Sequence, residues 1–522
     1  MKAPKPRVAV SLAALVIAAA ATAVGSSLAT TGERPVKPVA EPSSTAPASE
    51  AAKPLRWHSC GKDAPVAAEC AELRVPLDYA RPQAEKITLG LARVRATDPD
   101  KRVGSLLFNP GGPGGEATTP VIAAARGAKV FTEETRRRFD VIGLDPRGVG
   151  RSARIKCDPA IWNETVSLLP ETTAEYAALV SHNRRLGRSC AERTGRLINF
   201  LDANSQARDL EEVRKALGEG KLNYLGISYG SFLGTTYASM FPRKIRTMAI
   251  DGILDHSLSE TTMFTNEAMT VESTLNRFIA WCDATPSCAL HGRAGAVVDK
   301  LLADADQRPL PAPDCAASGA CRPLVTGEDI RLNLQPKLFF KDPNPDLGFP
   351  GWPGTAADLA QAAGGDASAF SQPTATSSDD GVFAGLIIAC MEFPAESRNF
   401  AELQGKMLLG RTITPRMLGM SQTWSLVAGC IDWPVPASNP PKRLTVRKAP
   451  PILLVNSTHD PSDNYIWAHG VLAQLPTNAV LLTRDGDGHS SWFLRPNSQT
   501  VAAMERYLIT GQTPAPNTVL PN

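Results

Sequence analysis

The sequence has little net charge, and it lacks the cysteine and histidine spacings of a metal site. Its 55 Lys and Arg residues nearly balance its 52 Asp and Glu residues, giving +3 over 522 residues. Charge therefore provides no argument for a nucleic-acid partner. No Cys-x-x-Cys motif or Cys/His cluster occurs, which argues against zinc. What remains is a globular composition, 43% hydrophobic and 20% charged, in a chain long enough for one large domain with an insertion.

The N-terminus predicts export. A basic start, MKAPKPR, precedes the apolar run Val8–Val24 and a stretch of small residues, the pattern of a signal peptide over residues 1–29. Residues 30–54 are rich in Pro, Ala, Ser, Thr and Glu and are expected to form a disordered linker. An uncleaved membrane anchor is the alternative, although the run is short for a span. We therefore predict a secreted protein with no stable membrane partner after cleavage.

Cysteine usage agrees with export. The chain has ten cysteines, and an even number in an exported protein favours disulfides. The simplest pairing joins neighbours along the chain: Cys60–Cys70, Cys157–Cys190, Cys282–Cys288, Cys315–Cys321 and Cys390–Cys430.

Short β-rich runs alternate with helical stretches at both ends of the chain, but not in its middle. Expected strands cover 87–94, 103–109, 139–145, 222–228, 246–252, 449–460 and 478–489. This alternation predicts an α/β fold with a mostly parallel central sheet flanked by helices. The middle shows helical segments without a strand series and predicts an inserted, mainly helical cap. The expected order is core over 55–256, cap over 257–444, core over 445–511, and a tail over 512–522.

The segment Gly226-Ile227-Ser228-Tyr229-Gly230 lies between an expected strand and an expected helix. A serine between two glycines in that context indicates a nucleophile elbow, a strained turn that lifts the hydroxyl above the carboxyl edge of the sheet. The motif alone is short, and an ordinary glycine-bracketed loop is the alternative. Ser228 is the candidate nucleophile.

A serine nucleophile needs a base and an acid. Among the seven histidines, His489 follows the last expected strand in a glycine-rich loop, where this fold places its base. Asp460 ends the preceding expected strand and is the candidate acid. Asp463 is the rival acid, with a turn or helix cap as its other interpretation. Asp485 and Asp487 are expected to be loop and turn residues.

A fourth element follows the strand at 103–109. The glycines of FNPGGPGG allow backbone N–H groups to face a developing oxyanion, and we expect the amides of Gly112 and Tyr229 to do so. A phosphate-binding loop is the competing interpretation, but no Walker lysine follows. Arg147, in DPRGVGRS, is expected to be structural and to brace the active-site loops.

With these motifs in place, the chain resembles the secreted bacterial tripeptidyl aminopeptidases, relatives of the proline iminopeptidases with an α/β-hydrolase fold and a TAP-like C-terminal region. The similarity extends from Trp57 to Gly511. It rests on NPGGPGG, FDVIGLDPRGVGRS, LNYLGISYGS, STHDPSDNY, GDGH, IIACMEFP and AGCIDWPVP. The resemblance implies a triad of Ser228, Asp460 and His489, in agreement with the residue-based assignment. Relatives commonly continue DPATP where this chain has DPSDN, so substrate positioning beside the acid departs from the family pattern.

An exopeptidase that acts on N-termini must recognise an ammonium group, for which cap carboxylates are suited. Glu392 and Asp432, next to the cysteines expected to pair as Cys390–Cys430, are the candidates, and ordinary solvated charges are the alternative. Relatives usually carry an Asp at the Glu392 position, so the acidic character is retained.

The sequence thus predicts an exported serine exopeptidase that releases short peptides, expected to be tripeptides, from the N-termini of peptides or proteins without metal or organic cofactor. A carboxylic ester hydrolase of the same fold is one alternative, because a triad does not distinguish amide from ester. A catalytically idle binding protein is the other.

Overall fold

The computed structural model describes residues 54–494 and 498–522. The predicted signal peptide and all but the last residue of the predicted linker lie outside the described residues. Within the described part of the chain, no helix has the length and apolar character needed to cross a membrane.

A ten-stranded sheet forms the centre, in the order β1-β2-β3-β5-β4-β6-β7-β10-β11-β12. The pairs from β1 to β5 are antiparallel, and all pairs beyond β5 are parallel. The mostly parallel sheet therefore agrees with the sequence prediction. The strands are β1 His58–Ser59, β2 Ala68–Pro76, β3 Lys86–Val94, β4 Gly104–Asn109, β5 Phe139–Leu144, β6 Leu222–Ile227, β7 Ile245–Asp251, β10 Ile452–His459, β11 Ala479–Asp487 and β12 Thr518–Pro521.

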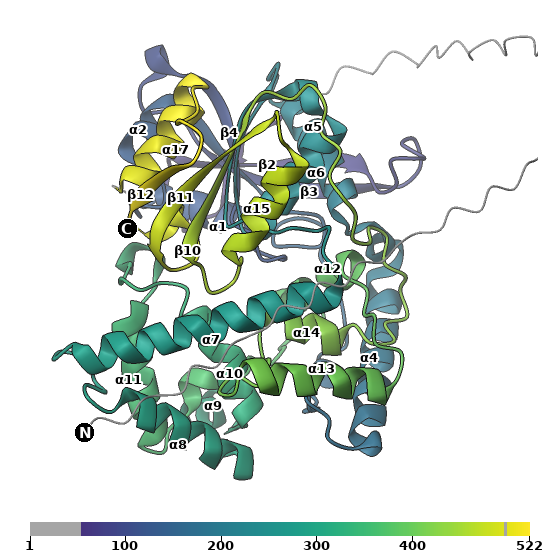
Figure 1. The fold of residues 1–522 in the computed structure, drawn as a ribbon. Coiled ribbons are helices and arrows are strands. Elements are labelled where there is room, and N and C mark those ends of the chain that lie inside the picture. Colours follow the sequence, from purple (N-terminus) through teal and green to yellow (C-terminus); the bar gives the residue numbers. More distant parts are fainter. Residues whose placement is uncertain (1–53, 495–497) are drawn as a thin grey trace, which may run out of the picture. The chain divides into compact units, whose positions relative to one another are not determined.

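Helices cover both faces of this sheet (Figure 1). Apolar residues of α5, α6 and α15 pack on one face, and those of α1 and α17 pack on the other. Since both faces are covered, the central strands β4 and β6 are buried throughout and consist largely of apolar residues. The helices are α1 Thr118–Ala125, α2 Glu133–Arg138, α5 Ala203–Ala216, α6 Tyr229–Met240, α15 Tyr465–Gln474, α16 Ser491–Leu494 and α17 Gln499–Thr510.

Between β7 and β10 the chain forms the helices of the cap, which lie along the carboxyl ends of the parallel strands (Figure 1). Two apolar clusters hold them together, one around Trp352 and one around Trp424. The helices are α7 Glu260–Ala284, α8 Ala294–Gln307, α9 Pro313–Ser318, α10 Gly327–Lys337, α11 Gly351–Ala363, α12 Ala384–Glu392, α13 Phe400–Ile413 and α14 Gln422–Gly429.

One helix from the first core segment packs with this cap. The helix α4, Thr173–Thr194, places Leu179 in the cluster that contains Trp424, and Asn183 donates hydrogen bonds to the carbonyls of Ala428 and Ile431. The cap therefore includes residues before 257, because an insertion between β5 and β6 folds onto it.

The C-terminal segment also differs from its description as a tail. Thr518–Pro521 forms β12, which pairs in parallel with β11. Four residues followed by the chain end give almost no periodic signal, and Pro521 is tolerated because β12 is an edge strand. The short first strand and β2 were likewise not predicted.

Five disulfides are present, joining Cys60–Cys70, Cys157–Cys190, Cys282–Cys288, Cys315–Cys321 and Cys390–Cys430. This is the neighbour-to-neighbour pairing that the sequence predicted. Each bridge closes a loop of at most 40 residues, so the disulfides fasten local segments.

Arg147 forms a buried ion pair that holds the core together. Its guanidinium donates to both carboxylate oxygens of Asp209 on α5, at 2.7 and 2.6 Å. It also donates to the carbonyls of Leu77 and Phe200, and Tyr79 donates its hydroxyl to Asp209 at 2.7 Å. Arg147 therefore fastens α5 to neighbouring loops of the core.

We expect Arg147→Met to lower the free energy of unfolding by about 3–5 kcal/mol, because the Asp209 carboxylate would stay buried without its cation. Denaturant titration measures this change. The control is Arg196→Met, which removes a pair with Glu85 in which both side chains are half exposed and should cost less than about 1 kcal/mol. Equal effects of the two substitutions would contradict the prediction.

Candidate active site

Ser228 occupies a strained turn between β6 and α6. Its φ of 56° and ψ of −122° lie in a region that residues with a side chain rarely adopt. Its amide donates to the carbonyl of Asp251 at 2.9 Å, which fixes the turn against β7. The serine is partly exposed and lines a hollow of about 460 Å³. This is the strand–turn–helix geometry that presents a nucleophile.

The two glycines around Ser228 are required by close approach of other backbone. A Cβ on Gly226 would stand 2.4 Å from the carbonyl oxygen of Gly230, and a Cβ on Gly230 would stand 2.9 Å from that of Asn109. Both distances are too short for a side chain, so the glycines allow the elbow to close against β4.

His489 and Asp460 are brought together at the carboxyl ends of β11 and β10. The Nδ1 atom of His489 lies 2.9 and 3.0 Å from the two carboxylate oxygens of Asp460. The backbone amides of Ser462 and Asp463 also donate to Asp460, which fixes the carboxylate. His489 lines the same hollow as Ser228. A histidine oriented at Nδ1 by a carboxylate has its Nε2 atom free for proton transfer.

Asp463 is a second carboxylate on the same histidine. Its Oδ2 atom lies 3.8 Å from Nδ1 of His489, is buried, and has no hydrogen-bond partner among the described residues. Asp460 is therefore the carboxylate closer to His489. Asp463, the alternative acid predicted from the sequence, lies near the same histidine. Burial raises the pKa of Asp463 to about 7, with the charge of Asp460 adding to the shift and that of His489 opposing it.

The surrounding carboxylates control the protonation of His489. Burial lowers the pKa of this histidine, but the charge of Asp460 and its hydrogen bond, together with the charges of Asp463 and Asp251, outweigh burial and raise it to about 9. A general base must be neutral to accept a proton, so activity is expected to increase with pH above the ordinary range of a histidine.

We expect Asp463→Asn to move the acid limb of the kcat/KM profile to lower pH. The substitution removes a negative charge that stabilises the imidazolium, so His489 would lose its proton at a lower pH. Asp485→Asn, an exposed carboxylate on β11, is the control and should leave the profile unchanged. An unchanged profile for Asp463→Asn, or equal shifts for both variants, would contradict this expectation.

The two predicted oxyanion donors are the backbone amides of Tyr229 and Gly112. Tyr229 is the first residue of α6, so its N–H has no intrahelical acceptor. Gly112 lines the hollow directly, and the preceding turn is fixed by the Gly111 amide, which donates to the Asn109 side chain at 2.9 Å. Tyr229 thus follows Ser228 directly in the chain, and Gly112 lines the same hollow as Ser228; their role as oxyanion donors stays a prediction.

Asp251 is a site residue that the sequence analysis missed. Its carboxylate accepts from the Trp492 amide at 2.8 Å and from the Ser490 hydroxyl at 3.2 Å, and burial raises its pKa. Since its carbonyl accepts from Ser228, it connects the elbow to the segment after His489. The strand-terminal position that identified Asp460 would have identified Asp251 as well.

Residues of the cap also hold the catalytic loop. Glu267 on α7 is buried and accepts from Gln335 of α10 at 2.9 Å, and Gln335 donates to the carbonyl of Pro461 at 3.0 Å. Thr270 donates to the carbonyl of Asp460 at 2.8 Å. Nothing in the local sequence distinguishes these polar residues from those on an exposed helix face, so sequence analysis did not find them.

Glu392 and Asp432 do not line the hollow at Ser228. Glu392 is fully buried and accepts from the Asn439 amide, the Ala203 backbone amide and the Tyr229 hydroxyl. Burial, with the charge of Asp202, raises its pKa to about 8. Glu392 thus fixes the side chain of Tyr229, the residue after the nucleophile, through a hydrogen bond.

Asp432 is half exposed and forms an ion pair with Arg184 of α4. The Cys390–Cys430 disulfide forms as predicted, but it does not bring the two carboxylates to a shared partner: Glu392 accepts from Asn439 and Asp432 pairs with Arg184. The short sequence distance from each cysteine to its acid does not determine where the side chain points, which is why the sequence could not separate them.

The chain is similar to known proteins over most of its length. A family model described as alpha/beta hydrolase fold matches residues 104–295, and one described as TAP-like protein matches residues 415–520. The tripeptidyl aminopeptidase of Streptomyces lividans is 27% identical over 476 residues, covering 88% of this chain and 85% of that protein.

Two mycobacterial proteins are similar to a comparable extent. Serine protease Hip1 of Mycobacterium bovis is 28% identical, covering 88% of this chain and 90% of that protein. Carboxylesterase B of Mycobacterium tuberculosis is 29% identical, covering 88% of each. The match to the alpha/beta hydrolase family model confirms the α/β-hydrolase fold predicted from the sequence.

Proposed function

We propose that this chain, which belongs to the tripeptidyl aminopeptidase family of α/β-hydrolases, is a serine exopeptidase that releases short peptides, tripeptides in particular, from free N-termini. The observation that carries the proposal is the convergence of a strained Ser228, the His489–Asp460 pair and the Gly112 loop on one hollow. The names of the relatives support peptides as the substrate class.

The reaction follows from these positions. The Ser228 hydroxyl attacks the carbonyl carbon of the scissile peptide while His489 accepts its proton. The Gly112 and Tyr229 amides hold the oxyanion. The carbon–nitrogen bond then breaks, His489 protonates the leaving amine, and an acyl-enzyme remains. Water, deprotonated by His489, hydrolyses the ester and releases the peptide. Asp460 keeps the imidazole in the required tautomer and stabilises the imidazolium.

For recognition of the ammonium group we propose Glu116 in place of the two carboxylates inferred from sequence. Glu116 is exposed, lines the hollow beside Gly112 and is oriented by the Thr119 hydroxyl at 2.6 Å. None of the other described residues that line this hollow has an acidic side chain. A carboxylate at this position would attract the ammonium of a bound peptide.

Glu116→Gln is expected to raise KM about fivefold for peptides with a free N-terminus, the effect of losing a partly exposed ion pair, while kcat changes little. Glu133→Gln, at an exposed helix start, is the control. The same increase in KM for an N-acetylated ester substrate would argue against a role in ammonium recognition.

An ester hydrolase is the second candidate. The similarity to a protein named carboxylesterase favours it, as do the four phenylalanines among the hollow's lining residues, Phe339, Phe340, Phe349 and Phe493. The idle binding protein is disfavoured, because Ser228, His489 and Asp460 are all retained in the sequence.

We also propose that the protein is exported. The predicted signal peptide lies outside the described residues, so the support comes from the five disulfides, since such bridges persist in oxidising compartments.

A panel of chromogenic amides of one, two and three residues, assayed beside simple esters, tests the proposal. We expect preferred turnover of the tripeptide amide and loss of this turnover in Ser228→Ala. Ester cleavage without amide cleavage would support the second candidate instead. Equal residual turnover in wild type and Ser228→Ala would overturn both enzymatic functions.

A further inference from the structure

A second cavity, of about 320 Å³, lies in the cap and shares no lining residue with the hollow at Ser228. It is bounded by α4, by the segment 162–168, by α10 and by α14. Its apolar walls include Leu168, Leu179, Leu186, Leu332, Leu386 and Met420. Apolar walls of this extent suit a bound apolar group.

Three polar side-chain atoms in this lining are buried without a hydrogen-bond partner among the described residues. They are Nε of Arg322, Nε2 of Gln372 and Nδ1 of His182. Buried polar atoms in proteins are nearly always hydrogen-bonded, so three in one cavity call for an explanation. The first two are donors.

His182 supplies an acceptor. Its Nε2 lies 3.0 Å from the carbonyl oxygen of Ile161, so Nε2 carries the hydrogen in the neutral ring, and Nδ1 presents a lone pair. His182 is 9% exposed, and its helix α4 is fixed to the cap by the hydrogen bonds of Asn183.

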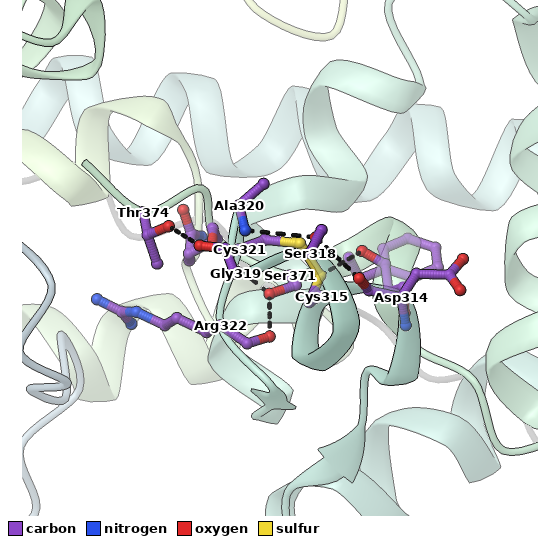
Figure 2. Close-up of a disulfide and its surroundings, with 12 residues drawn as sticks. Asp314, Cys315, Ser318, Gly319, Ala320, Cys321, Arg322, Ser371 and Thr374 are labelled. Atoms are coloured by element: carbon purple, nitrogen blue, oxygen red, sulfur yellow. Dashed lines mark hydrogen bonds between the residues drawn. A yellow bond between two sulfur atoms is a disulfide. The ribbon is translucent and has the colours of Figure 1, made fainter. Parts of the chain in front are cut away.

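The two donors are held in place by the fold. The Arg322 amide donates to the carbonyl of Gln372 at 3.0 Å, and the Ser371 hydroxyl donates to the carbonyl of Arg322 at 2.7 Å. Cys321 of the Cys315–Cys321 disulfide directly precedes Arg322, and the Arg322 side chain extends away from the disulfide (Figure 2). Arg322 Nη2 donates to the carbonyl of Glu164 at 3.0 Å, which fixes the guanidinium while Nε stays unpaired.

The charges around the cavity select against an anionic ligand. Glu328 and Asp329 line the cavity together with Glu164. Glu328 accepts from the Ser167 hydroxyl and the Leu168 amide, and Nη1 of Arg322 lies 3.9 Å from Asp329. Glu164 is already paired with Arg185, which leaves the single Arg322 charge opposite the carboxylates of Glu328 and Asp329, so a further negative charge would be unfavourable.

We propose that this cavity is a second binding site, for an apolar group that carries an uncharged amide, the chemistry of a hydrophobic residue within a peptide. The amide carbonyl accepts from Arg322 and Gln372, its N–H donates to His182, and the side chain occupies the apolar walls. The site is separate from the catalytic hollow, so it does not depend on which reaction Ser228 performs.

The test measures binding of N-acetyl-leucinamide to the Ser228→Ala protein by calorimetry. We expect binding to weaken about fivefold in Gln372→Leu, which removes one neutral hydrogen bond and keeps an apolar side chain. Val166→Trp, which fills the cavity from its wall, should abolish binding. Val66→Trp, at a fully exposed position, is the matched control and should have no effect. N-acetyl-leucine, with a carboxylate, should bind more weakly than the amide.

Several results would overturn the proposal. Absence of amide binding would do so, as would binding that is unaffected by both Gln372→Leu and Val166→Trp. Loss of binding in Leu347→Trp, which fills the hollow at Ser228, would place the amide there instead. A crystal of the Ser228→Ala protein soaked with the amide gives an answer even if a cavity variant does not fold, and density in the hollow alone would contradict the second site. Tighter binding of the carboxylate would contradict the amide assignment.

Discussion

Replacing Ser228 with alanine is expected to lower kcat for tripeptide amide hydrolysis by about 10⁴-fold or more, since removal of a triad nucleophile leaves only the oxyanion donors and binding. KM should change little, because the side chain that is removed is small and is one of many that line the hollow. Steady-state kinetics with a tripeptide amide, on protein freed of any contaminating peptidase by inhibitor treatment, measures the loss.

The control for this variant is Ser231→Ala. Ser231 lies one helical turn away on α6 and is fully buried. Its amide donates to the carbonyl of Ser228 at 2.7 Å, a bond that alanine retains, whereas its hydroxyl accepts from the Leu254 amide at 3.0 Å, a bond whose loss should lower stability rather than kcat. The variant should keep most of the wild-type activity. If Ser228→Ala retained activity within tenfold of wild type, Ser228 could not be the nucleophile, and the elbow would have only a structural role.

Asp460→Asn is expected to lower kcat by about 10³–10⁴-fold, because an amide in place of the carboxylate favours the wrong tautomer of His489. Asparagine can still accept from the Ser462 and Asp463 amides, so the loop should keep its conformation. Kinetics at a pH well above the acid limb separates this effect from simple titration.

Asp463→Asn is a direct comparison for Asp460→Asn, because both carboxylates lie near His489. Asp463 is 3.8 Å from His489, whereas Asp460 is 2.9 Å from it, so Asp463→Asn should reduce kcat far less than Asp460→Asn. If Asp463→Asn caused the larger loss, the roles of the two carboxylates would have to be exchanged. The thermal unfolding midpoint of each variant shows whether a loss of activity reflects a loss of folded protein.

The sequence predicted most of the central sheet, because its strands begin with short apolar runs. The strands that precede Ser228, Asp460 and His489 contain LNYLGI, ILLV and AVLL, and polar or glycine residues follow each run, so the strand ends could be located. The elbow was predicted because its glycines are required by contacts with residues close in sequence or on the next strand. The disulfides were predicted because each joins neighbouring cysteines.

What the sequence could not predict depends on the arrangement of the cap. Glu392 follows Cys390 by two residues, yet its carboxylate points toward Tyr229 and Asn439 beneath the elbow. Glu116 was overlooked because it is one charged residue after a glycine-rich loop, and only the folded hollow shows its position. The carboxylate that can contact a substrate depends on how helices far apart in the sequence pack together. No local sequence pattern predicts this packing.

The central claim is that this enzyme cleaves peptides from a free N-terminus at Ser228. Mass spectrometry of the products from two decapeptides of the same sequence, one with a free and one with an acetylated N-terminus, tests it most directly. The proposal predicts a tripeptide and a heptapeptide from the free peptide, little cleavage of the acetylated one, and neither product with Ser228→Ala. Equal cleavage of both peptides, or fragments of the free peptide that do not fit successive removal of three residues from its N-terminus, would contradict it.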